Sequence, residues 1–584
     1  MRFSAHHGFG LLCRGLAAVA CVALGAAVAS AQLMVDGNIV FNNNASGTLA
    51  GQFTGTASTG PLCTGLTPAQ IATLTFTNNH YADPLLPTAP YLPGVRPNFQ
   101  PAMGSPAYTG ALTLPVDGFF EQTCYVGAMG PGLDWTEGWT YWDSTGASRQ
   151  DLHLAGMPNP RPLAVYDNIR ILGKQYFGPD SNYLVRGQLR IKDQASLTVA
   201  PGVVIFEENA TLGTIIVERG GQLWAIGNKC EPIIVTSDDA PGTMTRGRCG
   251  GIVINGRAKT NLVNSCAGDS AATEGGAIGY YGGNDDNDCS GALRYVRVEF
   301  AGKEITPNNE LNSFTWCGCG RNTRGDYLQA YMGADDSFEW FGGTMDQKHL
   351  VATDGTDDGY DWQMGTRNRA QFVIIRPSPR FAPSGTQNGD KGIEADDNEF
   401  DFNATQCAGR SNCFLANFTI VGDKRTGSQF PGPVAGANFR RGTAATLVNS
   451  IVTNFKTSAV KVDDNATLQA HCAAVPTALA VYCPGALSAG EQGLTGQVLV
   501  SSSAPNPFRD QVSLHFTLPQ AGDVKVEVYG ADGRLVATIA DGQRMEAGRH
   551  SLLWRLPQGT PSGMYFYKVR AGAQSATGKL TRID

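Results

Sequence analysis

The sequence predicts an all-β protein, built mainly as a right-handed parallel β-helix with an N-terminal cap region and a smaller C-terminal β-sandwich. The main observation is a repeated phrase. Asp335–Trp340 reads Asp-Asp-Ser-Phe-Glu-Trp, and Asp357–Trp362 reads Asp-Asp-Gly-Tyr-Asp-Trp. A looser third copy begins at Asp396. A fixed period of about 20 residues indicates a repeat architecture.

The strand-like segments also recur at fixed steps, and the step is shorter in the earlier part of the chain. Leu328, Leu350 and Phe372 are separated by the same number of residues as the first two copies of the phrase, and so are Ile393 and Leu415. Leu197, Ile215 and Ile233 are separated by a smaller, equally constant number. One such repeat cannot bury its own apolar face, so neighbouring repeats must stack. The pattern lacks the Leu-x-x-Leu-x-Leu phrase of leucine-rich repeats and is too short for a propeller blade, which favours the β-helix.

Stacking would bring the acidic pairs of the three copies into one ladder, because equivalent residues of successive coils lie about 4.8 Å apart. The pairs are Asp335 with Asp336, Asp357 with Asp358, and Asp396 with Asp397. Like charges at this separation repel by about 1 kcal/mol in water and several-fold more at a dielectric near 20. A bound Ca²⁺ would relieve the repulsion, since it accepts about six to eight oxygen ligands. The simpler alternative is that these residues only form turns.

Composition and charge argue against nucleic acid as a partner and against a membrane-spanning helix. The 584 residues carry a net charge of −7 and no basic tract, so we do not expect the protein to bind nucleic acid. The 72 Gly and 31 Pro are typical of a turn-rich β protein. No apolar stretch of about 20 residues follows the N-terminal one, so no transmembrane helix is expected in the mature chain.

Residues 1–31 have the pattern of a secretory signal peptide. Arg2 and Arg14 precede the apolar run Leu16–Val28, which ends at Ala29-Ser30-Ala31. Cleavage is expected before Gln32, and Cys21 offers an alternative lipoprotein site. The mature protein would therefore pass through the periplasm to a secreted or outer-surface location.

Twelve of the 14 cysteines remain after removal of the signal, an even number that favours disulfides in an exported chain. Their order suggests local pairs, namely Cys63–Cys124, Cys230–Cys249, Cys266–Cys289, Cys407–Cys413 and Cys472–Cys483. Cys317 and Cys319 are left over. They could form a strained ring, bridge elsewhere or bind a metal.

Three regions precede the C-terminal one. Residues 32–183 are rich in Gly, Pro and aromatic residues, notably Phe119–Phe120 and Trp135–Trp139. We expect this region to cap the first coil, whose core and strand edges would otherwise be exposed. An aromatic platform for carbohydrate is the alternative. Residues 184–470 are predicted as the β-helix and 471–503 as a linker.

Basic residues gather after the second acidic copy. They are Arg367, Arg369, Arg376, Arg380 and Lys391. Beside carboxylates they would clamp an acidic sugar or form ordinary surface ion pairs.

In repeat period and strand composition the solenoid resembles the pectate-lyase-like β-helix superfamily. In the lyases of that group, calcium held by aspartates neutralises a uronate carboxylate, and an arginine or lysine removes the adjacent proton. The resemblance implies that Asp335, Asp336, Asp357 and Asp358 are ligands, with a base among Arg376, Arg380 and Lys391. The Arg-x-Pro-x-x-Arg signature of the lyases and the Asn-Thr-Asp and Gly-His-Gly phrases of the hydrolases do not occur. The resemblance therefore extends to the fold and not to the activity.

Residues 504–584 change to alternating strands separated by turn phrases, which predicts an Ig-like β-sandwich. Their ordered motifs resemble the C-terminal sorting domain of the type IX secretion system. These are Pro505–Phe508, Tyr529–Arg534, Ala547–His550, Pro561–Tyr567 and Gly578–Leu580. The resemblance implies recognition by the secretion machinery, passage through the outer membrane, and release or attachment at the cell surface.

Two functions are compatible with these features. The first is a non-catalytic β-helix that binds extracellular polysaccharide or acts as an adhesive or structural element. The second is a calcium-dependent polysaccharide lyase or glycoside hydrolase. An enzyme needs a cleft with convergent acid and base groups, and the missing signatures favour the first. The sequence does not identify the ligand.

Overall fold

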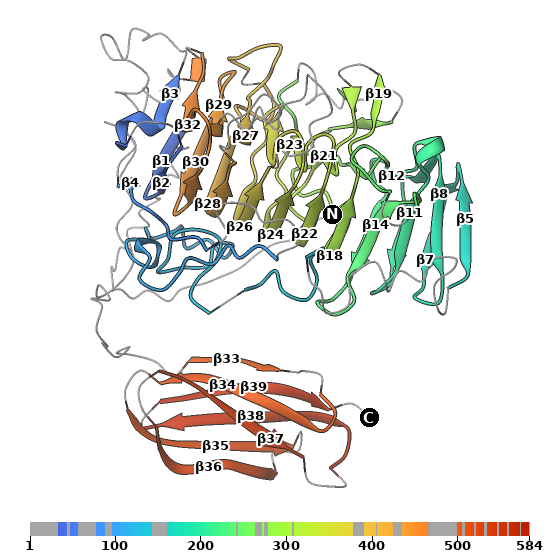
Figure 1. Cartoon of the computed structure of the whole chain (residues 1–584). Helices are drawn as coiled ribbons and strands as arrows, with labels where there is room; N and C mark the ends of the chain where they lie inside the picture. The colour runs from blue at the N-terminus through green and yellow to red at the C-terminus, as the bar shows by residue number, and fades with distance from the viewer. Residues whose placement is uncertain are drawn as a thin grey trace, which may run out of the picture. The chain divides into compact units, whose positions relative to one another are not determined.

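The chain folds into two compact units, residues 1–484 and 485–584 (Figure 1). The computed structural model describes residues 33–43, 47–55, 78–87, 96–132, 134–142, 161–240, 243–262, 271–273, 278–306, 309–377, 391–404, 406–423, 435–464, 466–467, 499–504, 508–518, 521–530, 534–545, 548–556, 560–572 and 574–582. The predicted signal peptide, 1–31, and most of the predicted linker lie outside these residues. Among the described residues no helix is long and apolar enough to span a membrane.

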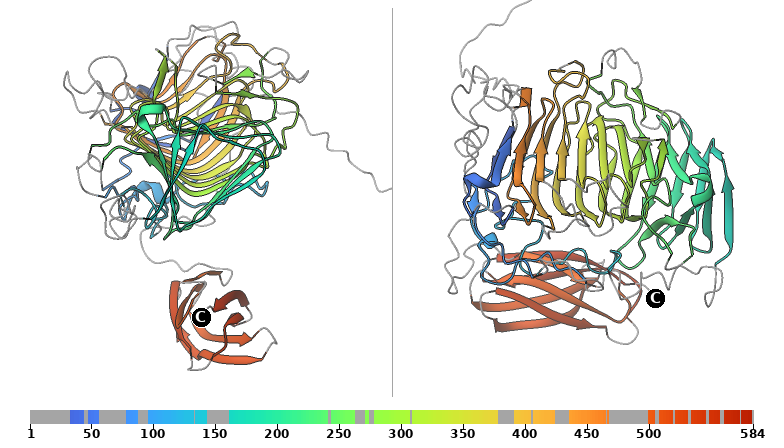
Figure 2. Two further views of the ribbon diagram at one scale, coloured as in Figure 1. Left: turned by 90° about the vertical axis from the view of Figure 1, so that its right-hand side faces the viewer. Right: turned by 45° about the horizontal axis from the view of Figure 1, so that its top comes forward.

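The first unit is a parallel β-helix whose coils contribute strands to three faces (Figure 2). One face is an 11-stranded sheet. In spatial order it contains β3 (Phe53–Gly55), β32 (Ser458–Val462), β29 (Ala435–Phe439), β27 (Lys391–Ala395), β25 (Tyr360–Gln363), β23 (Phe338–Gly343), β21 (Phe314–Cys319), β15 (Ile252–Asn255), β12 (Thr214–Val217), β9 (Gln188–Ile191) and β6 (Arg170–Ile171).

The other two faces belong to one 17-stranded sheet. Five long strands cross both faces: β18 (Gly291–Glu299), β22 (Arg324–Tyr331), β24 (Gln347–Thr353), β26 (Arg369–Arg376) and β28 (Asn412–Val421). The second face alone contains β7 (Lys174–Phe177), β10 (Ser196–Val199), β13 (Gln222–Ile226), β30 (Ala444–Val448) and β1 (Leu33–Asp36). The third contains β5 (Leu163–Asp167), β8 (Asn182–Arg186), β11 (Val204–Glu207), β14 (Ile233–Ser237), β31 (Ile451–Thr453), β2 (Ile39–Phe41) and β4 (His80–Tyr81).

The first unit also contains short strands and 3-10 turns outside the two main sheets. They are the hairpin strands β16 (Ala271–Ala272), β17 (Tyr280–Tyr281), β19 (Glu304–Thr306) and β20 (Asn309–Glu310), and the 3-10 turns η1 (Ala50–Gln52), η3 (Pro106–Tyr108) and η5 (Asn209–Thr211).

Aromatic residues of the repeated phrases fill the core of the β-helix. Phe338 and Trp340 of β23 point inward and are at most 1% exposed, as are Tyr360 and Trp362 of β25. Trp340 is in register with Trp362, so the offset between the two phrases is one full coil at this point. Burial of such rings on successive coils gives the continuous core that stacked repeats require.

The predicted step from Leu328 to Leu350 is also a coil length, because these residues pair on adjacent coils. The remaining predicted spacings are not coil lengths. Leu197 pairs with Leu223, whereas Ile215 lies in the other sheet and pairs with Leu189, so the shorter step relates different faces. Ile393 and Leu415 likewise belong to different sheets. Leu350 pairs with Val373 rather than Phe372.

Phe372 instead occupies a corner where a long strand turns from one face to the next. Such corner residues adopt positive φ, with 62° at Phe372, 52° at His349 and 54° at Tyr327. Their rings stack along the coils, with centroids of Tyr327 and His349 4.2 Å apart. A residue held in this left-handed conformation interrupts the strand alternation. The shift in pairing arises earlier in the coil: Phe341 is in register with Gln363 but Gln347 with Ala370, so one extra residue lies between Gln363 and Ala370.

The N-terminal strands lie at the end of the β-helix opposite to the one predicted. β1 pairs with β30, β2 with β31 and β3 with β32, so residues 33–55 add a coil beyond the last one (Figure 1). The prediction that residues 32–183 cap the first coil is therefore wrong in its placement. The first coil itself is formed by β5, β6 and β7, so the β-helix begins at Leu163, before the predicted boundary at 184.

Residues 96–132 and 134–142, called the strap below, lie along the outer side of the long strands. The backbone nitrogen of Glu121 donates to Gln371 Oε1 at 2.8 Å, and that of Ala128 donates to Thr419 Oγ1 at 2.8 Å. Trp139 is fully buried, so it serves packing rather than an exposed carbohydrate platform. Outward polar side chains of the sheet thus satisfy the backbone of a segment with little secondary structure of its own.

The second unit consists of two antiparallel sheets that share one hydrophobic core. Their strands are β33 (Leu499–Ala504), β34 (Gln511–Leu518) and β37 (Gly548–Arg555) in one sheet, and β36 (Leu535–Met545), β35 (Gly522–Gly530), β38 (Gly563–Ala571) and β39 (Gln574–Arg582) in the other. β33 lies within the predicted linker, which therefore ends before residue 499. The alternating strands predicted for residues 504–584 are present.

Four of the five predicted disulfides are wrong, because at least one cysteine of each pair is a thiol. Cys230 is an exposed thiol, whereas Cys249 is a buried thiol next to the carbonyl of Glu299. Cys407 is disulfide-bonded, but Cys413 keeps a buried thiol because it faces the core.

Of the remaining cysteines, Cys289 and Cys319 are also thiols. Cys289 is therefore not bonded to Cys266. Cys124 is a thiol as well, so it is not bonded to Cys63, and Cys317 is a thiol like Cys319. Cys472 and Cys483 lie outside the described residues, and so does the predicted pair between them.

Candidate cation site

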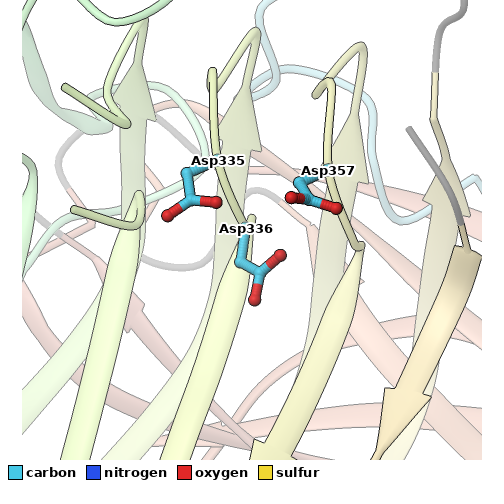
Figure 3. Close-up of side chains that lie close together, drawn as sticks. All are labelled: Asp335, Asp336 and Asp357. Carbon is cyan, nitrogen blue, oxygen red and sulfur yellow. The ribbon is translucent and has the colours of Figure 1, made fainter. Parts of the chain in front are cut away.

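The first two acidic pairs stack on adjacent coils, just before β23 and β25. Figure 3 shows Asp335 and Asp336 on one coil and Asp357 on the next. Ligand oxygens of these three residues lie within 4.8 Å of one another. The backbone nitrogen of Asp358 donates to Asp336 Oδ1 at 2.9 Å, which ties the two turns together. This hydrogen bond agrees in part with the alternative prediction, in which the acidic residues form turns.

A second acidic column was missed from the sequence. Glu339, Asp361 and Glu394 occupy equivalent positions in β23, β25 and β27 and are in direct register. Because their neighbours Phe338 and Trp340 point into the core, these carboxylates lie on the outer side of the sheet. The signal was present: the fifth residue of both repeated phrases is acidic and stands between two buried aromatics.

The two columns meet at Asp361. One oxygen each of Asp336, Glu339 and Asp361 lie within 4.8 Å of one another, and Asp358, Asp361 and Glu394 form a similar group. All five side chains are buried. Asp361 is 8% exposed, and its Oδ1 has no hydrogen-bond partner. A buried carboxylate oxygen without a partner is costly, so this oxygen is a natural ligand position.

Burial and mutual repulsion govern the charge of this site. Burial, followed by repulsion from Asp361, raises the pKa of Asp336 well above its ordinary value. Burial, followed by repulsion from Glu394, likewise raises the pKa of Asp361. A divalent cation would favour the ionised forms of both groups and offset these effects.

The two ends of the outer column differ in their partners. Lys391 Nζ lies 2.6 Å from Glu394 Oε1 and 3.5 Å from Asp358 Oδ2, and Arg440 also pairs with Glu394. At the other end, neutral amides of Asn312 and Gln363 donate to Glu339. The group around Asp336, Glu339 and Asp361 is therefore the better candidate for a cation. Its donors are carboxylate oxygens, which suit Ca²⁺.

The third acidic pair does not extend the ladder, which corrects the prediction for Asp396 and Asp397. The first two pairs precede their strands, whereas this pair follows β27 and lies at its opposite end. Asp396 forms ion pairs with Arg440 and Arg441. Asp397 accepts a hydrogen bond from the backbone nitrogen of Ser411 at 2.6 Å, and burial raises its pKa to about 7.

Of the two base candidates among the described residues, Lys391 lies beside the acidic groups and Arg376 does not. Arg376 forms a buried pair with Asp354, with Nη2 2.9 Å from Oδ2, and Arg380 lies outside the described residues. Arg369 pairs with Asp346 and Asp117, and Arg367 pairs with Asp286. These two form ordinary ion pairs.

The stacked coils define a parallel β-helix protein. Residues 173–483, more than half of the 584, match the model of the pectate-lyase-like beta helix domain, and the chain belongs to this family. Residues 504–582 match the secretion system C-terminal sorting domain. The sorting domain indicates interaction with the secretion machinery and export to the cell surface or beyond.

Among solved structures, the chain is similar to the enzymatically active domain of tailspike protein 2 of bacteriophage CBA120. The identity is 8%, the TM-score is 0.22, and the match covers 68% of this chain and 72% of the tailspike chain. A TM-score this low supports no argument. No curated protein matches the chain.

Proposed function

We propose that this protein is a non-catalytic β-helix of the cell surface or the extracellular medium that binds glycan or acts as an adhesive or structural element. In this proposal a Ca²⁺ ion bound by Asp336, Glu339 and Asp361 stiffens the middle coils. The observation that carries the proposal is the buried stack of carboxylates with an unpartnered oxygen on Asp361. Such a stack supports a structural ion better than a catalytic one, because a substrate needs access.

The arrangement of Lys391 also favours a structural reading. Its amine lies between Asp358 and Glu394, and the side chain is only 16% exposed. An ammonium held by two carboxylates is a partner in an ion pair, and proton abstraction would require it to leave both. A polysaccharide lyase is the second candidate, and the observation in its favour is that Lys391 lies next to a possible calcium site.

The test is thermal unfolding of the purified mature chain in Ca²⁺ and after chelation. A ligand that binds only the folded state stabilises it by mass action, so chelation should lower Tm by several degrees. An unchanged Tm would contradict the calcium part of the proposal. Incubation with polygalacturonate, alginate and neutral glycans distinguishes the two candidates. Unsaturated or new reducing ends would favour the enzyme, and binding without cleavage would favour the proposed function.

A further inference from the structure

A groove of about 1060 Å³ lies over β9 and the neighbouring coils of the 11-stranded sheet. Its walls are formed by outward side chains of β6 and β9, by the segments after β9, β12 and β15, and by residues 279–285. The volume exceeds what a single sugar needs and suits a chain of several units, since sites for drug-sized ligands measure about 300–1,000 Å³.

The groove continues the outer column that carries the carboxylates. Register links Glu339 through Thr315, Val253 and Ile216 to Arg190, and Arg190 to Arg170. One line of side chains along the β-helix is therefore acidic in the middle coils, apolar further on and basic at the first coils. Two guanidinium groups on adjacent coils repel each other as the carboxylates do, and an anion would relieve this repulsion.

The lining is positively charged on a chain that is negative as a whole. Five basic side chains face three acidic ones in the groove, whereas the chain carries a net charge of −7. The basic residues are Arg170, Arg190, Lys192, Arg219 and Arg257, and the acidic ones are Asp193, Glu218 and Asp285.

Internal pairing uses up only part of the positive charge. Glu218 is shared by Arg190 and Lys192, and Asp193 pairs with Arg257 at 2.8 Å. Arg219 donates to the carbonyl oxygen of Gly282 at 3.1 Å, which leaves its charge uncompensated. Arg170 is exposed, and no described side chain pairs with it. Guanidinium groups are suited to bidentate contacts with carboxylate, sulfate or phosphate.

An aromatic side chain stands at the edge of the same groove. Tyr280 of β17 lines it and is 60% exposed. An exposed tyrosine combines an apolar ring face with a polar hydroxyl. Such a ring can stack on the apolar face of a sugar while neighbouring arginines contact its charged groups.

We propose that this groove binds an anionic polysaccharide directly through its arginines, without a bridging metal ion. The inference rests on the proposed glycan-binding function and identifies its site and ligand class. It differs from recognition at the carboxylate site, where an anionic sugar would need a cation between itself and the protein. Binding in the groove should therefore be sensitive to salt and insensitive to chelation.

The experiment measures binding of the full mature chain to polygalacturonate, dextran sulfate and neutral dextran, each in about 50 and about 300 mM NaCl, with and without chelator. We expect binding to one or both anionic polymers and not to dextran, about tenfold weakening at the higher salt concentration, and no effect of chelation. The two anionic probes distinguish carboxylate from sulfate recognition. The double variant Arg170→Gln/Arg219→Gln should weaken binding about tenfold or more.

The matched control is Lys174→Gln, which removes an exposed charge of the first coil outside the groove and should bind as the wild type does. Full binding by the arginine double variant, or loss of binding on chelation, would overturn the inference and leave glycan binding itself intact. Binding of neutral dextran without either anionic polymer would likewise overturn the inference and leave glycan binding itself intact. Failure of all three polymers to bind would overturn this inference together with the glycan-binding part of the proposed function.

Discussion

The backbone nitrogen of Ile39 donates a hydrogen bond to the carbonyl oxygen of Ser450 at 2.9 Å, joining the N-terminal strands to the last coils. β1, β2 and β3 thereby cover strand edges that residues 444–462 would otherwise expose. An open β-helix end exposes unpaired backbone groups to other chains, so these early residues protect the late ones.

Asn38 is the polar centre of this junction. It is fully buried, its Oδ1 accepts from the backbone nitrogen of Ser450 at 2.8 Å, and its Nδ2 donates to Leu447 O and Asn79 Oδ1. We expect Asn38→Ala to lower the free energy of unfolding by about 2–4 kcal/mol, because several buried polar groups lose their partners. Urea unfolding monitored by circular dichroism measures the change.

The control for this variant is Asn322→Ala, which removes one exposed hydrogen bond, to the carbonyl oxygen of Asn287. Its effect should stay within about 0.5 kcal/mol. Equal effects of both variants would show that the N-terminal coil contributes no special stability.

The sequence was sufficient where coils follow one another without insertion. Trp340 and Trp362 are in register on adjacent coils, so the spacing of the phrases was also the length of the coil. The next coil is longer, because Tyr360 pairs with Ile393 and additional residues separate β26 from β27. An insertion changes the offset without changing the fold, which is why the sequence predicted Asp396 as part of the acidic ladder although it lies elsewhere.

Other features could not be predicted from local patterns. Leu33 pairs with Ala445, at the other end of the β-helix sequence, and so short a strand carries no signal that selects so distant a partner. The groove arginines could not be predicted for the same reason. Only the strand register places Arg170 and Arg190 in the same column of side chains as Glu339. Glu339 itself was recoverable from its place between Phe338 and Trp340.

Glu207 should make stability depend on pH in a direction opposite to that of most carboxylates. It is fully buried, accepts from the backbone nitrogens of Ile215 and Gly251, and burial raises its pKa from 4.5 to about 8. Between these values the unfolded chain loses a proton that the folded chain keeps, so its contribution is present below about pH 4.5 and is lost as pH rises toward 8. Glu207→Gln should flatten this loss by a few kcal/mol, since one pKa unit corresponds to about 1.4 kcal/mol.

The neighbouring Glu208 is the control, measured by Tm at pH 5 and pH 8. Hydrogen bonds from Thr211 and Arg186 lower its pKa, so its contribution is lost only as pH falls below the ordinary range. Glu208→Gln should therefore leave the difference between pH 5 and pH 8 unchanged. A wild-type pH slope in Glu207→Gln would contradict the prediction.

The strap is attached by a buried ion pair. Arg297 Nε donates to Glu299 Oε1 at 2.6 Å, its Nη1 donates to the carbonyl oxygen of Trp139 at 3.0 Å, and both charged side chains are 1% exposed. Arg297→Met should cost about 3–5 kcal/mol, because it leaves a carboxylate buried without its partner. Adding Glu299→Gln should restore part of this loss, as a double-mutant cycle on the urea midpoints would show.

An exposed pair also connects the strap to the β-helix and serves as the comparison. Lys229 and Glu137 are 3.4 Å apart, with side chains 50% and 66% exposed. Lys229→Met should change the free energy of unfolding by less than about 1 kcal/mol. The double variant Arg297→Met/Glu299→Gln could also be no more stable than Arg297→Met alone. The loss of stability would then come mainly from the lost hydrogen bonds and not from the unpaired charge.

Asp361 should have opposite effects on stability with and without calcium. Burial and repulsion raise the pKa of Asp361 and of Asp336, so in the absence of a cation their contributions to stability are lost as pH rises above the ordinary carboxyl range. Calcium binds the ionised forms, and the increase in Tm that it causes should be larger at pH 8 than at pH 5. Asp361→Asn removes both a repelling charge and a ligand, so it should raise Tm without calcium and reduce the increase in Tm that calcium causes.

The control is Asp401→Asn, an exposed change in the third acidic copy, which should alter neither the Tm without calcium nor the increase that calcium causes. If Asp361→Asn kept the full calcium response at pH 8, Asp361 would not be a ligand and the proposed cation site would be wrong.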